Sequence, residues 1–235
     1  MFLCIKFNFF GSAGELCQFA DILEKAEDFD KALHDLVCKT FTEHQRIIFD
    51  GNGYSAQWQE EAAHRGLSNY PTTAECLPAY IQQKNIDLVT RHGIFTEAEF
   101  RARYAIHMEA YNKIVGIEAR TMLDMAMRQI LPASLGYVRD LTEGIAAKCS
   151  LGLKGNAERS LVERLSDACD TLYDSCQQLR GDLAAIPEDT ETASRYYLKV
   201  ILPDMNRIRT AADTLEELTE KSRWPFPTYA DLLYY

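Results

Sequence analysis

Residues 161–186 read LVERLSDACDTLYDSCQQLRGDLAAI, and this stretch decides the fold class. Its apolar residues recur at spacings of three and four that mostly alternate: Leu161, Leu165, Ala168, Leu172, Cys176, Leu179, Leu183 and Ile186. This spacing places them on one side of a helix and is typical of helices that pack along their length. The stretch therefore predicts a long helix, which ends before Pro187 because proline cannot continue it.

Two further stretches predict long helices with a kink inside each. Residues 96–99 read TEAE, a capping box that opens an apolar pattern running to Leu141 and containing Pro132. The last helical pattern runs over residues 197–218 and contains Pro203. Each proline follows an Ile-Leu pair, so we expect a kink at both places.

The N-terminal half predicts one more long helix and several short ones. The apolar spacing favours a helix over residues 15–44, and shorter helices over residues 55–65, 72–78 and 79–91. Gly66 and Gly93 follow two of these helices, where glycine commonly ends a helix. The sequence thus predicts an all-α fold, an antiparallel bundle of long kinked helices with short helices at one end.

The first residues depart from this pattern. Residues 2–10 are apolar and aromatic, interrupted by Lys6 and Asn8, and a Gly-Ser-Ala-Gly break follows. This composition favours a β-strand, so we expect a residual N-terminal strand-like segment.

Composition limits the classes of partner. The chain has 235 residues and a net charge of −10, whereas binding to nucleic acid or to an anionic membrane needs clustered Lys and Arg. We therefore expect neither nucleic acid nor membrane as a partner. The seven cysteines include no CxxC pair, which favours reduced thiols and a cytoplasmic location.

Several short patterns resemble sites but lack the context that such sites need. The run Gly51-Asn52-Gly53 follows a short apolar segment, as in a dinucleotide-binding loop, but no βαβ unit follows, so we expect a turn with positive φ. Asp50, Asn52 and Glu61 match only part of a calcium loop. His34 and Cys38 lie four apart without a second pair of metal ligands. We assign no catalytic, cofactor-binding or metal-binding residue.

The C-terminal segment WPFPTY, residues 224–229, combines large apolar side chains with two prolines. The prolines stop the preceding helix and favour an extended path. Because Trp224, Phe226 and Tyr229 carry large apolar surfaces, we expect this possible docking tail to pack against the bundle or a neighbouring chain.

Several of these motifs, in this order, resemble the C-terminal region of type III glutamine synthetases. They are RIIF at residues 46–49 with GNGYS at 51–55, HGIFTE at 92–97, IEARTMLDMA at 117–126 and WPFPTY at 224–229. The resemblance runs from about Lys6 to the end of the chain. It implies a ligase family that makes glutamine from glutamate, ammonia and ATP with a divalent metal such as Mg²⁺, and that assembles into stacked hexameric rings.

The resemblance also implies that most catalytic residues belong to domains upstream of this region. In the family, a strand like KFEFR carries a Glu of the metal site and an Arg of the substrate site. Here the matching run places Asn8 and Phe10 at those two positions. Asn lacks the charge of a carboxylate and Phe lacks that of a guanidinium, so no catalytic residue is carried over and we expect no cofactor for this chain alone.

These observations lead to a division of the chain and to three functional hypotheses. Residues 1–13 are expected to be a remnant of a catalytic-domain strand, and residues 14–235 a helical C-terminal domain. The leading hypothesis is a structural or oligomerisation role without catalysis by the chain alone, with a homo-oligomer or the synthetase catalytic domains as partner. The alternatives are a subunit that completes an active glutamine synthetase in trans, and a stand-alone helical protein-binding module.

Overall fold

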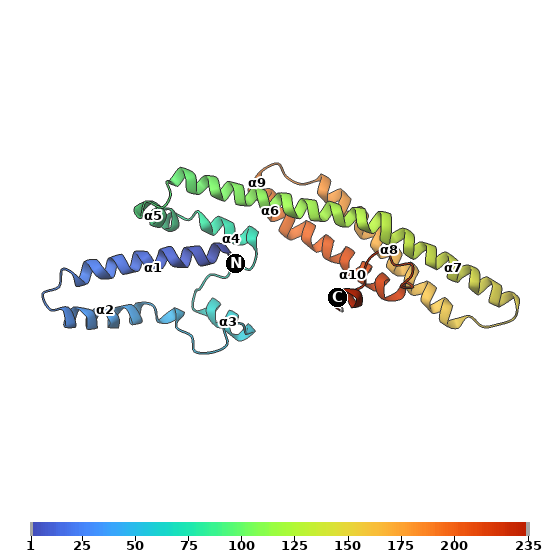
Figure 1. Ribbon diagram of the computed structural model, residues 1–235, viewed down its shortest axis with the longest axis horizontal. Helices are drawn as coiled ribbons and strands as arrows, with labels where there is room; N and C mark the ends of the chain where they lie inside the picture. Colours follow the sequence, from blue (N-terminus) through green and yellow to red (C-terminus); the bar gives the residue numbers. More distant parts are fainter. Residues whose placement is uncertain (1, 234–235) are drawn as a thin grey trace. The chain divides into compact units, whose positions relative to one another are not determined.

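The computed structural model describes the backbone of residues 2–233 and the side chains of residues 12–233. All regular elements of this described part are helical, so the prediction of an all-α fold with long kinked helices is confirmed. The chain divides into two compact units, of which the first ends at Ile106 and the second begins at His107. Figure 1 shows the order of the helices along the chain.

The N-terminal segment is helical, and the prediction of a strand-like segment is wrong. Residues 2–10 belong to α1 (Phe2–Leu23). A strand needs a neighbouring strand for its backbone hydrogen bonds, and the described residues contain none. A helix satisfies these groups within the segment itself, whatever the β-propensity of its side chains.

The predicted helix over residues 15–44 is interrupted. It consists of the end of α1 and of α2 (Phe29–Glu43), with a break at residues 24–28. The Asp28 side chain accepts a hydrogen bond from the Lys31 N–H and so caps α2, which explains why a new helix begins there.

Short helices complete the first unit: the single turn η1 (Gln45–Ile47), α3 (Ala56–His64), α4 (Thr73–Tyr80) and α5 (Gln83–Arg91). Gly66 and Gly93 follow α3 and α5 with φ of 70° and 62°, which confirms both as helix-ending glycines. A small core forms where Ile86, Val89 and Phe100 are buried together.

The second unit is built on long helices. α6 (Glu97–Met125) enters it and continues through the π-helical turn η2 (Ala126–Ile130) into α7 (Leu131–Ser150). A tight connection leads to α8 (Asn156–Ala184), which returns alongside α7 (Figure 1). The chain then forms α9 (Thr190–Tyr196), a second π-helical turn η3 (Tyr197–Ile201), α10 (Leu202–Leu218) and, after the tail, α11 (Tyr229–Leu233).

The two kinks share one cause. Pro132 and Pro203 each lie in the first turn after a π-helical turn. Proline has no N–H and its ring clashes with the carbonyl four residues earlier, and a π-helical turn relieves this clash without ending the helix. The helices therefore continue through the kinks expected at these positions, with one widened turn each.

The core of the second unit follows the predicted seam of α8. Leu165, Leu172, Cys176 and Leu179 are at most 2% exposed, and α8 packs against α7 and α10. On α10 and η3 the buried partners lie at the same alternating spacing: Tyr197, Ile201, Asp204, Ile208, Ala211 and Leu215. One of them, Asp204, is a carboxylic acid.

Candidate functional site

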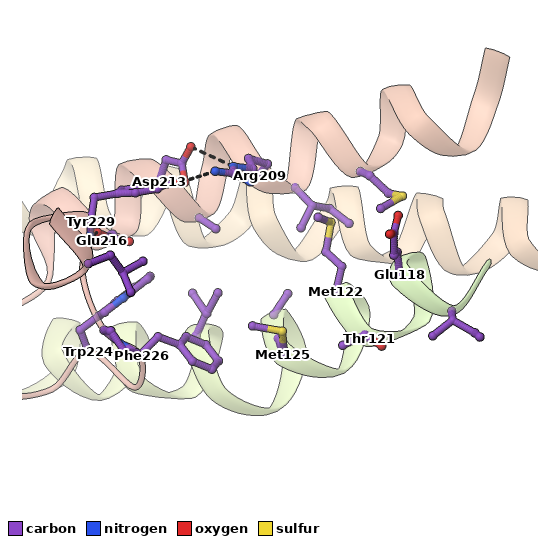
Figure 2. A pocket seen from close by; sticks show the side chains of 18 residues that line it. Glu118, Thr121, Met122, Met125, Arg209, Asp213, Glu216, Trp224, Phe226 and Tyr229 are labelled. Atoms are coloured by element: carbon purple, nitrogen blue, oxygen red, sulfur yellow. Dashed lines mark hydrogen bonds and ion pairs between the residues drawn. The ribbon is translucent and has the colours of Figure 1, made fainter. Parts of the chain in front are cut away.

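A pocket of about 580 Å³ opens in the second unit between α6, α10 and the C-terminal tail. Figure 2 shows its labelled side chains: Glu118, Thr121, Met122 and Met125 from α6, Arg209, Asp213 and Glu216 from α10, and Trp224, Phe226 and Tyr229 from the tail and α11. Its walls are mainly aliphatic, thioether and aromatic. The volume and this lining are typical of pockets that bind a largely apolar partner.

The tail forms one wall of the pocket. Trp224 is buried, and Phe226 is partly buried against the core of the second unit. Arg223 ties this segment to α7 through an ion pair of 2.6 Å with Asp140. The structure therefore brings Trp224, Phe226 and Tyr229, which the sequence singled out, into one site.

Tyr229 connects the tail to α10 through polar contacts. Its hydroxyl receives a hydrogen bond from Arg209 and donates one of 3.1 Å to Asp213. Its backbone N–H donates to Glu216 over 2.9 Å. The contact with Tyr229, followed by the charge of Asp213, raises the pKa of Arg209, so the guanidinium stays charged.

A short helix after the tail was not expected from the sequence. Thr228 precedes α11, and its N–H donates to Asp231 over 3.0 Å, while the Asp231 N–H donates back to the Thr228 hydroxyl. Hydrogen bonds from Lys221 and Thr228 lower the pKa of Asp231 to about 2. The sequence signal was a Thr-x-x-Asp spacing, the aspartate form of a capping box.

Carboxylates dominate the charged lining of the pocket. Asp213 is paired with Arg209, at 3.6 Å between Oδ2 and Nε. Glu118 and Glu216 carry the remaining negative charge, and they lie at opposite ends of the pocket in Figure 2. The arrangement can hold an apolar body and attract a positive charge.

Outside the pocket lining, the buried Asp204 is an unusual group. It is 2% exposed, forms an ion pair with Arg207 and lies against Asp182 of α8. Burial, and then hydrogen bonding with Asp182, raises the pKa of Asp204 to about 6. Hydrogen bonds, first from Gln178, lower the pKa of Asp182. The signal that could have identified Asp204 is its place in the apolar spacing between Ile201 and Ile208.

The short patterns of the first unit take local structural roles. Gly51 and Gly53 do not have positive φ, so that expectation is wrong. A Cβ on Gly51 would stand 2.7 Å from the Phe49 ring, which stacks on Trp58 at 4.0 Å between centroids. Close packing of Phe49, and not backbone conformation, is what requires a glycine there.

The possible ligand sets are likewise engaged in local contacts. Asn52 accepts a hydrogen bond from the Tyr54 N–H, and Glu61 pairs with Arg65 at 2.6 Å. His34 and Cys38 contact each other at 3.6 Å on the exposed side of α2. Among the residues that the structure describes, no group of three or more His, Cys, Asp or Glu side chains is placed to hold a metal ion.

A comparison with protein families shows to which family this chain belongs. Residues 32–149, half of the chain, match the family described as glutamine synthetase C-terminal domain. The chain belongs to the glutamine synthetase C-terminal domain family.

Full-length relatives of this glutamine synthetase domain agree with the assignment. A glutamine synthetase of Butyrivibrio fibrisolvens is 34% identical over 218 residues, which cover 88% of this chain and 30% of that protein. A type-3 glutamine synthetase of Dictyostelium discoideum is 30% identical over 222 residues, with 89% and 30% covered. The domain thus spans about 30% of the length of these relatives. In the described part of the chain, no helix is long and apolar enough to cross a membrane.

Proposed function

We propose that this domain has a structural role in a type III glutamine synthetase-like protein: it packs on the catalytic region or joins subunits, and it is not catalytic alone. The observation that carries the proposal is the match of residues 32–149 to the glutamine synthetase C-terminal domain family. In this proposal, ATP and Mg²⁺ belong to the catalytic region. The partners are the catalytic domains of the enzyme or further copies of the chain.

Exposed apolar surface supports a role in protein contact. On α2, Phe29, Leu33, Val37 and Phe41 recur every four residues and are 39–63% exposed. No described side chain of α2 is buried. A continuous apolar stripe of this kind is typical of a surface that another protein covers.

The proposal is tested by activity and by association. The isolated chain, assayed with glutamate, ammonia, ATP and Mg²⁺, is expected to form no glutamine. Size-exclusion chromatography with light scattering, repeated with synthetase from the source cells, is expected to show a complex. Mg²⁺-dependent turnover by the isolated chain would overturn the proposal, and so would a chain that stays monomeric under both conditions.

A further inference from the structure

We propose that the pocket between α6, α10 and the C-terminal tail is a docking site for an apolar, Lys- or Arg-bearing segment of a different polypeptide. The inference rests on the proposed function in one respect, that the domain works by contacting another protein. It adds the place of contact and the chemistry of the partner.

The apolar part of the pocket favours a side-chain anchor. Met122, Met125 and Met205 supply flexible, polarisable walls that adapt to the shape of an inserted group. Phe226 and Pro227 close the side formed by the tail. Aliphatic residues of a partner segment would bury their surface here, as amphipathic segments do in hydrophobic grooves.

The charges that line the pocket determine which charge a partner segment must carry. Asp213 is neutralised by Arg209, whereas Glu118 and Glu216 have no cation beside them in the lining. Glu216 accepts a hydrogen bond from the Tyr229 N–H, which leaves its second oxygen for a further donor. The pocket therefore has an excess of two negative charges and attracts Lys or Arg.

The separation of these charges favours a polypeptide over a compact organic cation. Glu118 and Glu216 lie at opposite ends of the pocket, with Met122 and Met125 between them in Figure 2. One small cation cannot contact both ends, whereas an extended or helical segment with two basic residues can. A second copy of this chain carries the same net charge of −10, which favours a different polypeptide.

The fluorescence of Trp224 can report directly on binding in the pocket. The sequence contains two tryptophans, so in a Trp58→Phe chain the emission reports on Trp224 alone, which lines the pocket. The probe is a 14-residue amphipathic peptide of Leu and Lys, compared with the same peptide carrying Glu in place of Lys. We expect saturable binding of the Lys peptide, weakened by added salt, and no saturable binding of the Glu peptide.

Matched variants locate the binding. In the Trp58→Phe background, Glu118→Gln with Glu216→Gln keeps the shape and the acceptor for the Tyr229 N–H, and should weaken Lys-peptide binding about tenfold. Glu163→Gln, an exposed glutamate of α8 outside the pocket, should leave it unchanged. Equal binding of both peptides, or no effect of the double variant, would overturn the inference. Full competition by benzyltrimethylammonium at equal concentration would also overturn it, in favour of a small cation.

The result separates this inference from the proposed function. A chain that binds the Lys peptide through Glu118 and Glu216, but stays monomeric both alone and with a synthetase, supports the pocket inference and contradicts the proposed function. A chain that joins a synthetase equally well with and without the double substitution supports the proposed function and contradicts the pocket inference.

Discussion

Gly116 lies on the buried side of α6, where a Cβ would stand 2.7 Å from the Tyr197 hydroxyl. Tyr197 is 6% exposed, so its ring cannot move away freely. We expect Gly116→Ala to lower the free energy of unfolding by about 1–3 kcal/mol, because an added methyl group overpacks this contact. Urea denaturation followed by circular dichroism measures the change.

Gly144 provides the control for this substitution. It is exposed in α7, and a Cβ there meets nothing within 4 Å. Gly144→Ala should therefore raise the free energy of unfolding by about 0.5–1 kcal/mol, the ordinary gain of Ala over Gly in a helix. If both variants shift stability in the same direction, the contact with Tyr197 does not decide the effect at Gly116.

Asp204 makes the stability of the domain depend on pH. Its pKa is about 6 in the folded chain, against 3.8 ordinarily, so the folded state holds a proton that the unfolded state releases. This contribution is complete below pH 3.8 and is lost as the pH rises through about 6. Asp182 and Arg207 act directly on the Asp204 carboxyl, and Gln178 and Tyr196 form hydrogen bonds with Asp182.

We expect Asp204→Asn to remove most of this dependence. Relative to the unsubstituted chain, the variant should gain about 1–3 kcal/mol of stability between pH 4 and pH 7. Urea midpoints measured across this range check the expectation. Asp174→Asn, an exposed aspartate on α8, is the control and should change the profile little. Parallel profiles for the chain and the Asp204 variant would contradict the assignment.

Among the helices, the N-terminal cap of α6 is a clear case of sequence-encoded structure. The Thr96 hydroxyl accepts from the Glu99 N–H, and Glu99 accepts from the Thr96 N–H over 2.9 Å. The hydrogen bonds from Thr96 lower the pKa of Glu99. Thr96→Ala removes one side of this exchange and should destabilise the domain by about 1 kcal/mol.

A threonine in the interior of a helix, unlike the capping Thr96, is not expected to stabilise the domain. Thr171 is exposed on α8 and its hydroxyl donates to the Asp167 carbonyl four residues earlier. Thr171→Ala should be neutral or slightly stabilising, because Ala has the higher helix propensity and no cap is lost. Thermal unfolding of both variants checks the pair, and an equal loss would show that the cap of α6 contributes nothing of its own.

The helices that could be predicted are those with periodic cores and caps. The seam of α8 and the capping box at Thr96 are local signals, and both have the predicted structure. The break at Asp28 was missed because an uninterrupted apolar spacing outweighed one capping residue. The segment at residues 2–10 was mistaken for a strand because β-propensity depends on a neighbouring strand, which the segment itself cannot supply.

The pocket could be predicted only in part, because it depends on contacts between distant segments. The aromatic tail was recognisable from Trp224, Phe226 and Tyr229. The position of this tail beside Met122 and Met125 could not be recognised from the sequence, since no local rule places residues 224–229 against residues 117–126. The charge pattern of the pocket emerges only when α6, α10 and the tail are brought together.

The two units of the molecule differ in how many side chains their helices bury. In the first unit, α2 and α3 have no buried described side chain. In the second, α8 buries one side along its length against α7 and α10. Because local opening is easiest where few apolar contacts hold a helix, we expect amides of α2 to exchange at least about tenfold faster than those of α8.

Hydrogen–deuterium exchange with mass spectrometry measures this difference, and dilution is its control. Exchange in α2 that slows as the protein concentration rises would show that further copies of the chain cover Phe29, Leu33, Val37 and Phe41. Fast exchange at every concentration, slowed only when a synthetase is added, would show that the catalytic region covers the stripe. Protection of α2 equal to that of α8 in a dilute monomer would contradict the expectation, because exposed apolar side chains give the helix no comparable source of stability.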